Sequence, residues 1–227
     1  MQQPELQRGY IGCTNNIPCW IHPHSTVGLH SPPEYLVYQD IVVSKRATMR
    51  GVTIVPADVL YRLGHSMCTF SAPMEDPPPW YDAAKDKLMC FATPRFGDHA
   101  WDLPVAAVPL PLDHKDRYRI FAQALLAGSV CQPLKSFVPS LRMKPATIMS
   151  RVAQPRVVSL LRALGERQVD SLPALHREWA REPNFLLEVY LLWVSNASHP
   201  EIRKMWPPKA LGSPLVQTAT KQTKRKR

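Results

Sequence analysis

The sequence lacks the motifs on which most nucleotide and ester chemistry depends. It contains no G-x-x-x-x-G-K-[ST] loop for nucleotide phosphates, no G-x-S-x-G turn, no H-E-x-x-H motif and no G-x-G-x-x-G fingerprint. Ser25 lies near His22 and His24, but no third group completes a hydrolytic triad. These residues therefore predict no catalytic site within the chain itself.

Long apolar runs and paired cysteines are also missing. No stretch reaches the ~18 consecutive apolar residues that a membrane span requires. The first eight residues are polar and lack the apolar core of a secretory signal. The five cysteines are an odd number, and none are spaced by two residues, which predicts reduced thiols in the cytosol or nucleus. We expect a soluble, non-secreted protein without a membrane partner.

A zinc site is only weakly indicated. Cys13, Cys19, His22 and His24 are the one cluster of potential ligands. Structural zinc sites usually begin with two ligands separated by two to four residues, a spacing that these cysteines do not have. The sequence therefore predicts no metal ligand.

Positive charge is abundant but unevenly distributed. The chain has a formal net charge of +10, with 28 Lys and Arg against 18 Asp and Glu. Six of the basic residues and no acidic ones lie in 209–227, which leaves a mildly basic folded part. A basic run of this kind attracts RNA, acidic proteins or nuclear import receptors, or is simply a solvated tail.

The residue pattern predicts an α+β protein with β structure first and helices later. Short β-branched and aromatic runs separated by turn residues indicate a small barrel or sandwich near the N-terminus. The 24 prolines argue against long helices and a doubly wound parallel sheet. We predict four stretches: a β module at 9–66, a proline-rich β/loop bridge at 67–112, a helical domain at 113–208 and a disordered basic tail at 209–227.

Individual elements can be placed within these stretches. Residues 9–11, 19–22, 34–43, 49–55, 87–93 and 104–110 are the expected strands, and Gly51 indicates a bulge or a close backbone approach. Helices are predicted at 116–127, behind Pro155, at 172–180 and at 185–194, with Gly128 and Gly165 as stops. Aromatic residues at helical spacing are expected in the core: Trp179, Tyr190, Trp193 and Trp206.

Three ordered segments carry a family resemblance. They read Trp-Ile-His-Pro-His-Ser at 20–25, Pro-Glu-Tyr-Leu-Val-Tyr-Gln-Asp-Ile-Val at 33–42 and Met-Arg-Gly-Val-Thr-Ile-Val-Pro at 49–56. The set resembles the OB-fold near the C-terminus of DEAH-box RNA helicases. Motifs further along include Pro-Pro-Pro-Trp-Tyr at 77–81 and Trp-Pro-Pro at 206–208. They are similar to those of the nucleolar DEAH helicases of the small-subunit processome, a subfamily with a helical C-terminal extension.

The resemblance implies an RNA-binding surface on this OB-fold. The matching positions are Lys45 and Arg46 in a loop and Arg50 at the start of the next strand, as phosphate contacts without sequence preference. Alternatively, they are ordinary solvated charges, and Arg50 pairs with Glu34 or Asp40. Thr48 departs from the family, which often has tyrosine there.

Other residues of the β module are expected to be structural. The alternation of Trp20, Tyr35 and Tyr38 predicts that they lie on one buried face, with base stacking as the less favoured interpretation. His22 is expected to hydrogen-bond backbone and fix the end of its strand.

The resemblance also implies a function. The chain would be an RNA-binding accessory region of a helicase in ribosome biogenesis, with single-stranded RNA or pre-rRNA, the helicase core in cis and ribosome-biogenesis proteins as partners, in the nucleus and nucleolus. No cofactor is expected in this chain; ATP and Mg²⁺ would belong to the core. The alternative is a motorless RNA- or protein-binding scaffold of pre-ribosomes, and a hydrolase using His22 or His24 is a marginal third hypothesis.

Overall fold

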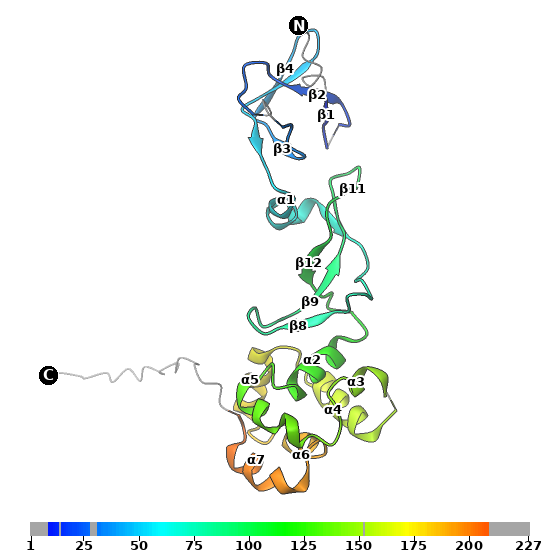
Figure 1. The fold of residues 1–227 in the computed structure, drawn as a ribbon, viewed down its shortest axis with the longest axis vertical. Coiled ribbons are helices and arrows are strands. Elements are labelled where there is room, and N and C mark those ends of the chain that lie inside the picture. Colours follow the sequence, from blue (N-terminus) through cyan, green and yellow to red (C-terminus); the bar gives the residue numbers. More distant parts are fainter. Residues whose placement is uncertain (1–8, 14, 28–30, 152, 209–227) are drawn as a thin grey trace, which may run out of the picture. The chain divides into compact units, whose positions relative to one another are not determined.

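The computed structural model describes residues 9–13, 15–27, 31–151 and 153–208 (Figure 1). The described residues form two compact units, which we call the strand unit and the helical unit. The strand unit lies within Met1–Pro79 and Met89–Pro109, and the helical unit within Trp80–Leu88 and Leu110–Arg227. The four sequence-based stretches stay predictions, and the basic tail 209–227 lies outside the described residues.

A four-stranded sheet opens the strand unit, in the order β1-β2-β5-β4. Its strands are β1 (Tyr10–Ile11), β2 (Pro18–Ile21), β5 (Ala47–Arg50) and β4 (Asp40–Val43). β2 runs parallel to β5, whereas β4 and β5 form an antiparallel hairpin. Cys19 and Met49 are buried on one face of the sheet. Because side chains alternate, Trp20 and Thr48 project from the opposite face.

Two expected strands are each divided in two. The segment 34–43 forms β3 (Leu36–Val37) and β4, and 49–55 contributes the end of β5 and then β6 (Thr53–Ile54). Gly51 stands at the second break with φ +62°, a conformation that favours glycine, and an added Cβ there would meet the Gln39 side chain rather than backbone. β3 and β6 pair as a separate two-stranded sheet. The α+β class is confirmed, but the described strands form no closed barrel, which corrects that expectation.

The remainder of the strand unit contains a helix and further antiparallel pairs. Its elements are α1 (Ala57–Leu63), η2 (His65–Met67), β7 (Cys68–Phe70), β9 (Lys87–Ala92, of which the last four residues lie in this unit), β10 (Pro94–Phe96), β11 (Trp101–Asp102) and β12 (Ala106–Pro109). Strands predicted at 87–93 and 104–110 are confirmed as β9 and β12, which pair with Ala92 opposite Ala106. The sequence reading missed α1, whose Asp58 and Arg62 suit the two ends of the helix dipole.

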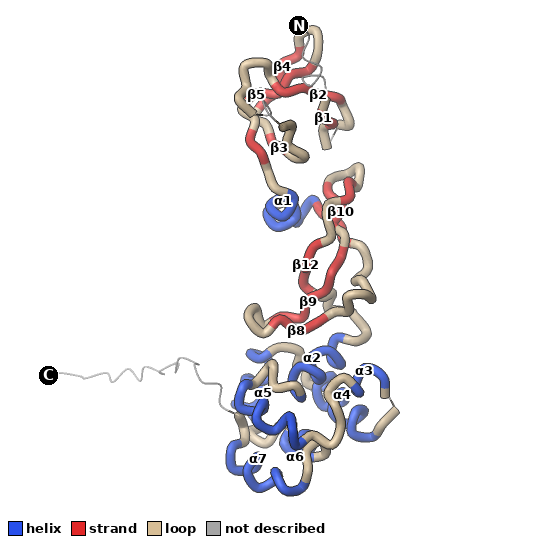
Figure 2. Tube along the Cα trace, in the orientation of Figure 1, coloured by secondary structure: helices blue, strands red, loops and turns tan. Residues whose placement is uncertain are grey.

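The helical unit packs short helices around an apolar core (Figure 2). Its elements are β8 (Trp80–Asp82), α2 (Arg117–Leu126), η3 (Gln132–Ser140), α3 (Thr147–Ser150), α4 (Pro155–Glu166), α5 (Leu172–Arg181), α6 (Leu187–Leu191), η4 (Asn196–Ser198) and α7 (His199–Met205). The helices expected at 116–127 and 172–180 are confirmed as α2 and α5. Across the described residues, no helix combines the length and the apolar character needed to cross a membrane.

Glycine and proline explain most helix ends in this unit. At the end of α2, Gly128 has φ +70°, its N–H donates to Leu125 O (3.1 Å), and the next N–H, of Ser129, donates to Ala124 O (2.9 Å). This pair of bonds is the Schellman motif. Pro155 begins α4 as predicted. α4 ends at Glu166, one residue after Gly165, so the predicted stop was close, although Gly165 itself is still helical.

The last predicted helix is shorter than expected. Residues 185–194 contain only α6, because Leu186 before it adopts a left-handed backbone with φ +65°. The aromatic prediction holds better: Trp179, Tyr190 and Trp193 are buried, and Trp206 is half-buried. The indole N–H groups of Trp179 and Trp206 both donate to Phe185 O, at 3.0 and 3.2 Å. Phe185 is thus held in place although it lies outside the helix.

Three side chains of the helical unit would become charged in alkali: Cys131 and Tyr190 are buried, and Tyr81 is half-buried. Burial raises the pKa of Cys131 to about 12 and also raises the pKa of Tyr190. Burial is also the largest cause of the raised pKa of Tyr81, and its hydrogen bond to Asp86 adds to the shift. All three side chains are therefore neutral in the folded protein at neutral pH.

We expect the free energy of unfolding of this unit to fall as pH rises above about 9. A raised folded pKa means that stability is fully present below the unfolded pKa, 9.0 for a thiol, and is lost as pH rises through the folded value of about 12. Cys131 alone should contribute up to about 1.4 kcal/mol per pH unit in this window. Urea unfolding followed by tryptophan fluorescence between pH 7 and 11 measures the slope.

The matched control is Cys131→Ala, which removes the thiol with little change in volume. This variant should lose stability less steeply than the parent above pH 9. Parallel curves for the two proteins would contradict the assignment to Cys131.

Candidate nucleic-acid interface

The predicted RNA contacts lie on the β4–β5 hairpin of the strand unit. Lys45 and Arg46 are exposed in the bend that joins the two strands, as expected. Arg50 is also exposed, but it is the last residue of β5 rather than the first of a following strand. The structure therefore places two cations at one end of the strand and the third at the other, separated by about 13 Å of extended chain.

The ring of Trp20 lies beneath the Arg46 side chain. The Arg46 guanidinium carbon lies 5.6 Å from the centre of the Trp20 ring, within cation–π range. The indole also lies close to the backbone of Gly9, because a Cβ added there would be 3.2 Å from the ring. Trp20 is half-buried rather than part of the core, which corrects the expectation for this residue.

Strand alternation places the second arginine on the same face as the ring. Trp20 is the register partner of Thr48 across the parallel β2–β5 pair, and Arg50 follows Thr48 by two residues. Asp40 is opposite Arg50 in the antiparallel register, and both are exposed. We call Trp20, Lys45, Arg46 and Arg50 the basic strand face. It combines three cations with one partly exposed aromatic ring.

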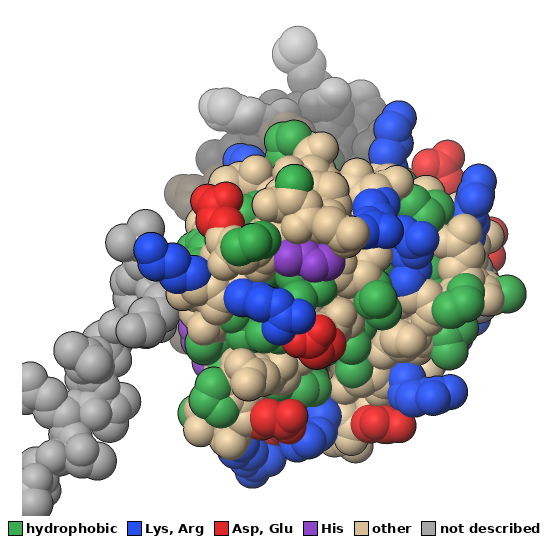
Figure 3. All heavy atoms as spheres, turned by 90° about the horizontal axis from the view of Figure 1, so that it is seen from below, with side chains coloured by type: hydrophobic (Ala, Val, Ile, Leu, Met, Phe, Trp, Pro, Cys, Tyr) green, Lys and Arg blue, Asp and Glu red, His purple; other side chains and the backbone are tan. Residues whose placement is uncertain are grey.

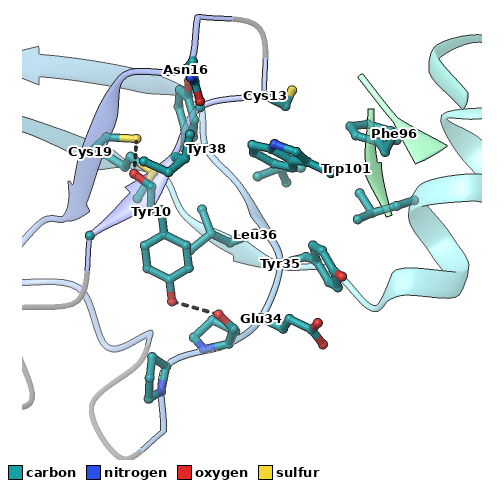
Figure 4. A pocket seen from close by; sticks show the side chains of 18 of the residues that line it. Tyr10, Cys13, Asn16, Cys19, Glu34, Tyr35, Leu36, Tyr38, Phe96 and Trp101 are labelled. Atoms are coloured by element: carbon teal, nitrogen blue, oxygen red, sulfur yellow. Dashed lines mark hydrogen bonds between the residues drawn. The ribbon is translucent and has the colours of Figure 1, made fainter. Parts of the chain in front are cut away.

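The other face of the sheet borders an aromatic pocket (Figure 4). Its cavity of about 1040 Å³ is lined by the buried sheet residues Cys19 and Met49. Five aromatic rings of the strand unit also line it: Tyr10, Tyr35, Tyr38, Phe96 and Trp101. Tyr35 and Tyr38 are half-buried at this pocket instead of in a closed core, which corrects their predicted place. The Tyr10 hydroxyl donates to Pro33 O at 2.9 Å.

The chemistry of the aromatic pocket does not suit a polyanion. No Lys or Arg occurs among its described lining residues, whereas Glu34 does. Burial raises the pKa of Tyr10, and burial together with neighbouring Glu34 raises that of Tyr35, so both phenols are neutral at neutral pH. Phosphate contacts dominate nucleic-acid affinity. The basic strand face is therefore the better candidate for an RNA interface.

His22 has the structural role expected of it. Its backbone N–H donates to Met49 O at 3.1 Å, and its ring Nδ1 accepts the backbone N–H of His24 at 3.2 Å. These bonds fix the end of β2. Within the part of the chain that the structure describes, no three His, Cys, Asp or Glu side chains form a group that could hold a metal ion.

Two family models match separate parts of the chain. The oligonucleotide/oligosaccharide-binding (OB)-fold model matches residues 2–67, which include the basic strand face. The model described as the DEAH helicase DHX37 C-terminal domain matches residues 133–210, within the helical unit.

Curated relatives agree with both models. The chain is 36% identical over 199 residues to the ATP-dependent RNA helicase DEAH13 of Arabidopsis thaliana and 38% identical over 193 residues to the probable ATP-dependent RNA helicase DHX37 of Homo sapiens. These alignments cover 87% and 84% of this chain and 16% of each relative. A putative ATP-dependent RNA helicase of Caenorhabditis elegans, rha-2, is 35% identical over 210 residues, which are 91% of this chain and 18% of the relative. The chain belongs to the DEAH-box RNA helicases and corresponds to a C-terminal region of that family.

Proposed function

We propose that this chain is an RNA-binding accessory region of a DEAH-box helicase that acts on pre-rRNA in small-subunit biogenesis. The observation that carries the RNA-binding part is the basic strand face, where Arg46 lies over Trp20 on a sheet matched by an OB-fold model. OB-folds bind single strands through a basic groove and exposed aromatic rings. The nucleolar, ribosome-related part is supported by the motifs shared with that helicase subfamily.

The cations supply affinity and the ring supplies a stacking surface. Lys45, Arg46 and Arg50 would each neutralise a phosphate and release a counterion, which gives binding that depends on salt and not on sequence. Trp20 offers a planar surface to a base beside the Arg46 guanidinium. ATP and Mg²⁺ would be bound by helicase core domains and not by residues of this chain, and the core would drive the strand along this surface.

Replacing Lys45, Arg46 and Arg50 together by alanine should weaken single-stranded RNA binding and make it less sensitive to salt. Three lost phosphate contacts should reduce the slope of log affinity against log salt by about 2 units. Fluorescence anisotropy with labelled oligo(U) at several salt concentrations measures both quantities. All three residues are exposed, so the variant should remain folded.

A charge-matched control separates this face from the overall positive charge. Arg62, Arg151 and Arg162 are exposed residues outside the face, and their joint replacement by alanine removes the same net charge. That variant should keep most of the salt slope. Equal slopes for the two triple variants would refute the basic strand face as the RNA interface.

A further experiment tests the helicase and ribosome parts of the proposal. An antibody against the helical unit should detect an endogenous protein several times heavier than 25.7 kDa that sediments with pre-ribosomal particles and stains nucleoli. A band at 25.7 kDa that binds pre-ribosomal partners without ATP would favour the motorless scaffold instead.

A further inference from the structure

A second pocket lies in the helical unit, far along the chain from the basic strand face. Its cavity of about 420 Å³ is formed by α4, α6, η4 and α7 together with the segment after η3. The lining combines positive charge, from Arg142, Arg156 and Arg203, with apolar surface from Leu191 and Leu192, and it also contains the carboxylate of Glu188. We call this site the arginine pocket. Three arginines face a single carboxylate in it.

Two of the three arginines already have partners. Arg203 makes a two-pronged pair with Glu188, with N–O distances of 2.7 and 3.0 Å. This pair lowers the pKa of Glu188, whose carboxylate is therefore charged at neutral pH. Arg142 donates to Val194 O at 3.0 Å and to the Asn196 side-chain oxygen at 2.6 Å. Both arginines hold the walls of the pocket in position.

Arg156 is different, because no acidic side chain among the described residues pairs with it. Its guanidinium carbon lies 6.0 Å from the centre of the buried Trp193 ring, at the limit of cation–π range. The Arg156 Nη1 atom is buried and has no hydrogen-bond partner among the described residues. A buried donor without an acceptor costs free energy. Because Arg156 also lines the pocket, its guanidinium is the one cation of the described lining that has no carboxylate or hydrogen-bonding oxygen paired with it.

The apolar surface beside Arg156 distinguishes between kinds of anionic partner. Leu192 is half-exposed at the pocket, and Leu191 and Pro155 complete its apolar surface. Basic and hydrophobic side chains are interspersed in the same way over the face of the molecule shown in Figure 3. Single-stranded RNA is usually bound by open basic grooves with exposed aromatic rings. The described lining contains no Phe, Tyr or Trp.

We propose that the arginine pocket binds a peptide segment of a protein partner in which an acidic residue lies next to an aliphatic one. The carboxylate pairs with Arg156, and the aliphatic side chain packs on Leu192. This inference concerns residues in the helical unit only, so it stands or fails separately from RNA binding by the basic strand face. It gives the helical unit a role in partner recognition.

The test uses the full chain and a short fluorescein-labelled peptide of alternating Glu and Leu, with the Gln–Leu peptide and oligo(U) as comparison probes. Arg156→Ala should weaken binding of the Glu–Leu peptide about tenfold or more, as expected for one charge-assisted hydrogen bond. Leu192→Ala should weaken it several-fold, and because Leu192 is half-exposed this variant should fold normally. The control is Arg162→Ala, an exposed arginine on the same helix that does not line the pocket.

Several results would overturn the proposal. Equal losses for Arg156→Ala and Arg162→Ala would indicate general electrostatic attraction, to which the basic residues of 209–227 also contribute. Equal affinity for the Gln–Leu peptide would exclude carboxylate recognition. A loss of oligo(U) binding in Arg156→Ala without a loss of peptide binding would assign the pocket to RNA phosphate. A melting curve for each variant confirms that the comparison is between folded proteins.

Discussion

Replacing Gly128 by alanine should destabilise the helical unit by about 3 kcal/mol. Gly128 has φ +70°, a left-handed conformation that costs an alanine roughly 1–2 kcal/mol. An added Cβ would also lie 2.5 Å from Lys135 Cα and 2.7 Å from Lys135 N. These are backbone atoms within η3, which carries the buried Leu134 and Phe137, and they cannot move away without disturbing it. Urea unfolding of the full chain, followed by tryptophan fluorescence, measures the loss.

Gly165→Ala is the matched control because the same substitution should have the opposite effect. Gly165 is the next-to-last residue of α4, and an added Cβ would meet only the Tyr118 ring at 3.9 Å, an ordinary contact distance. Alanine in a helix interior is favoured over glycine by up to about 1 kcal/mol. We therefore expect a small stabilisation. Similar losses at both positions would contradict this explanation of Gly128.

These two glycines also show what the sequence could predict. Both follow an apolar helical stripe, and a glycine in that position is the ordinary signal for a helix end. Only Gly128 adopts a left-handed backbone at the end of its helix, and Lys135 returns close to it after an intervening turn. A pattern within one helix carries no information about such an approach. Gly165, by contrast, lies inside α4 beside the ring of Tyr118, a residue of α2.

The strand unit shows a related limit. Segments 34–43 and 49–55 have the composition of continuous strands, and the sequence analysis treated each as one. The structure breaks both at neighbouring points, near Gln39 and Gly51, where the Gln39 N–H donates to Arg50 O at 3.0 Å. Gly51 was a local signal, for which a bulge or a close backbone approach was predicted, and it stands at the break with φ +62°. The matching break on the facing segment depends on pairing between strands, which the sequence did not reveal.

The candidate RNA site was predicted in part. Lys45 and Arg46 are exposed in a turn, which the motif order and their charge anticipated. Trp20 was assigned to the core because its alternation with Tyr35 and Tyr38 was interpreted as one buried face. The missed signal was Cys19 beside it: two adjacent strand residues cannot both face the core, and Cys19 is the buried one. The alternation was visible, but the sequence did not show which of the two faces is covered.

Long-range contacts account for what the sequence could not predict in the helical unit. Residues 80–88 read as part of a proline-rich bridge, yet the structure groups them with the helices. We attribute this grouping to Asp86. Its Oδ1 accepts the Tyr81 hydroxyl at 2.5 Å and the backbone N–H of Leu172, the first residue of α5, at 3.0 Å. The Asp86 carboxylate therefore accepts a free backbone N–H at the N-terminus of α5, although it lies 86 residues earlier in the chain.

Replacing Asp86 by alanine should destabilise the helical unit by about 3 kcal/mol, since two hydrogen bonds to a charged group are lost at once. The Tyr81 hydroxyl and the Leu172 N–H would both lose an acceptor in a partly buried place. Asp86 itself has φ +48°, so alanine adds backbone strain there. Asp86→Asn avoids that strain, because asparagine tolerates this conformation, and should cost less than Asp86→Ala.

Tyr81→Phe separates the two hydrogen bonds. It removes only the phenol, so it should cost about 1 kcal/mol, and the double variant Asp86→Asn, Tyr81→Phe should cost less than the sum of its parts. A second readout is specific to the contact. The hydrogen bond to Asp86 and its negative charge both raise the pKa of Tyr81, so Asp86→Asn should shift phenol ionisation, followed by ultraviolet absorbance, to lower pH. Additive losses together with an unchanged tyrosine titration would mean that Asp86 does not join residues 80–88 to α5.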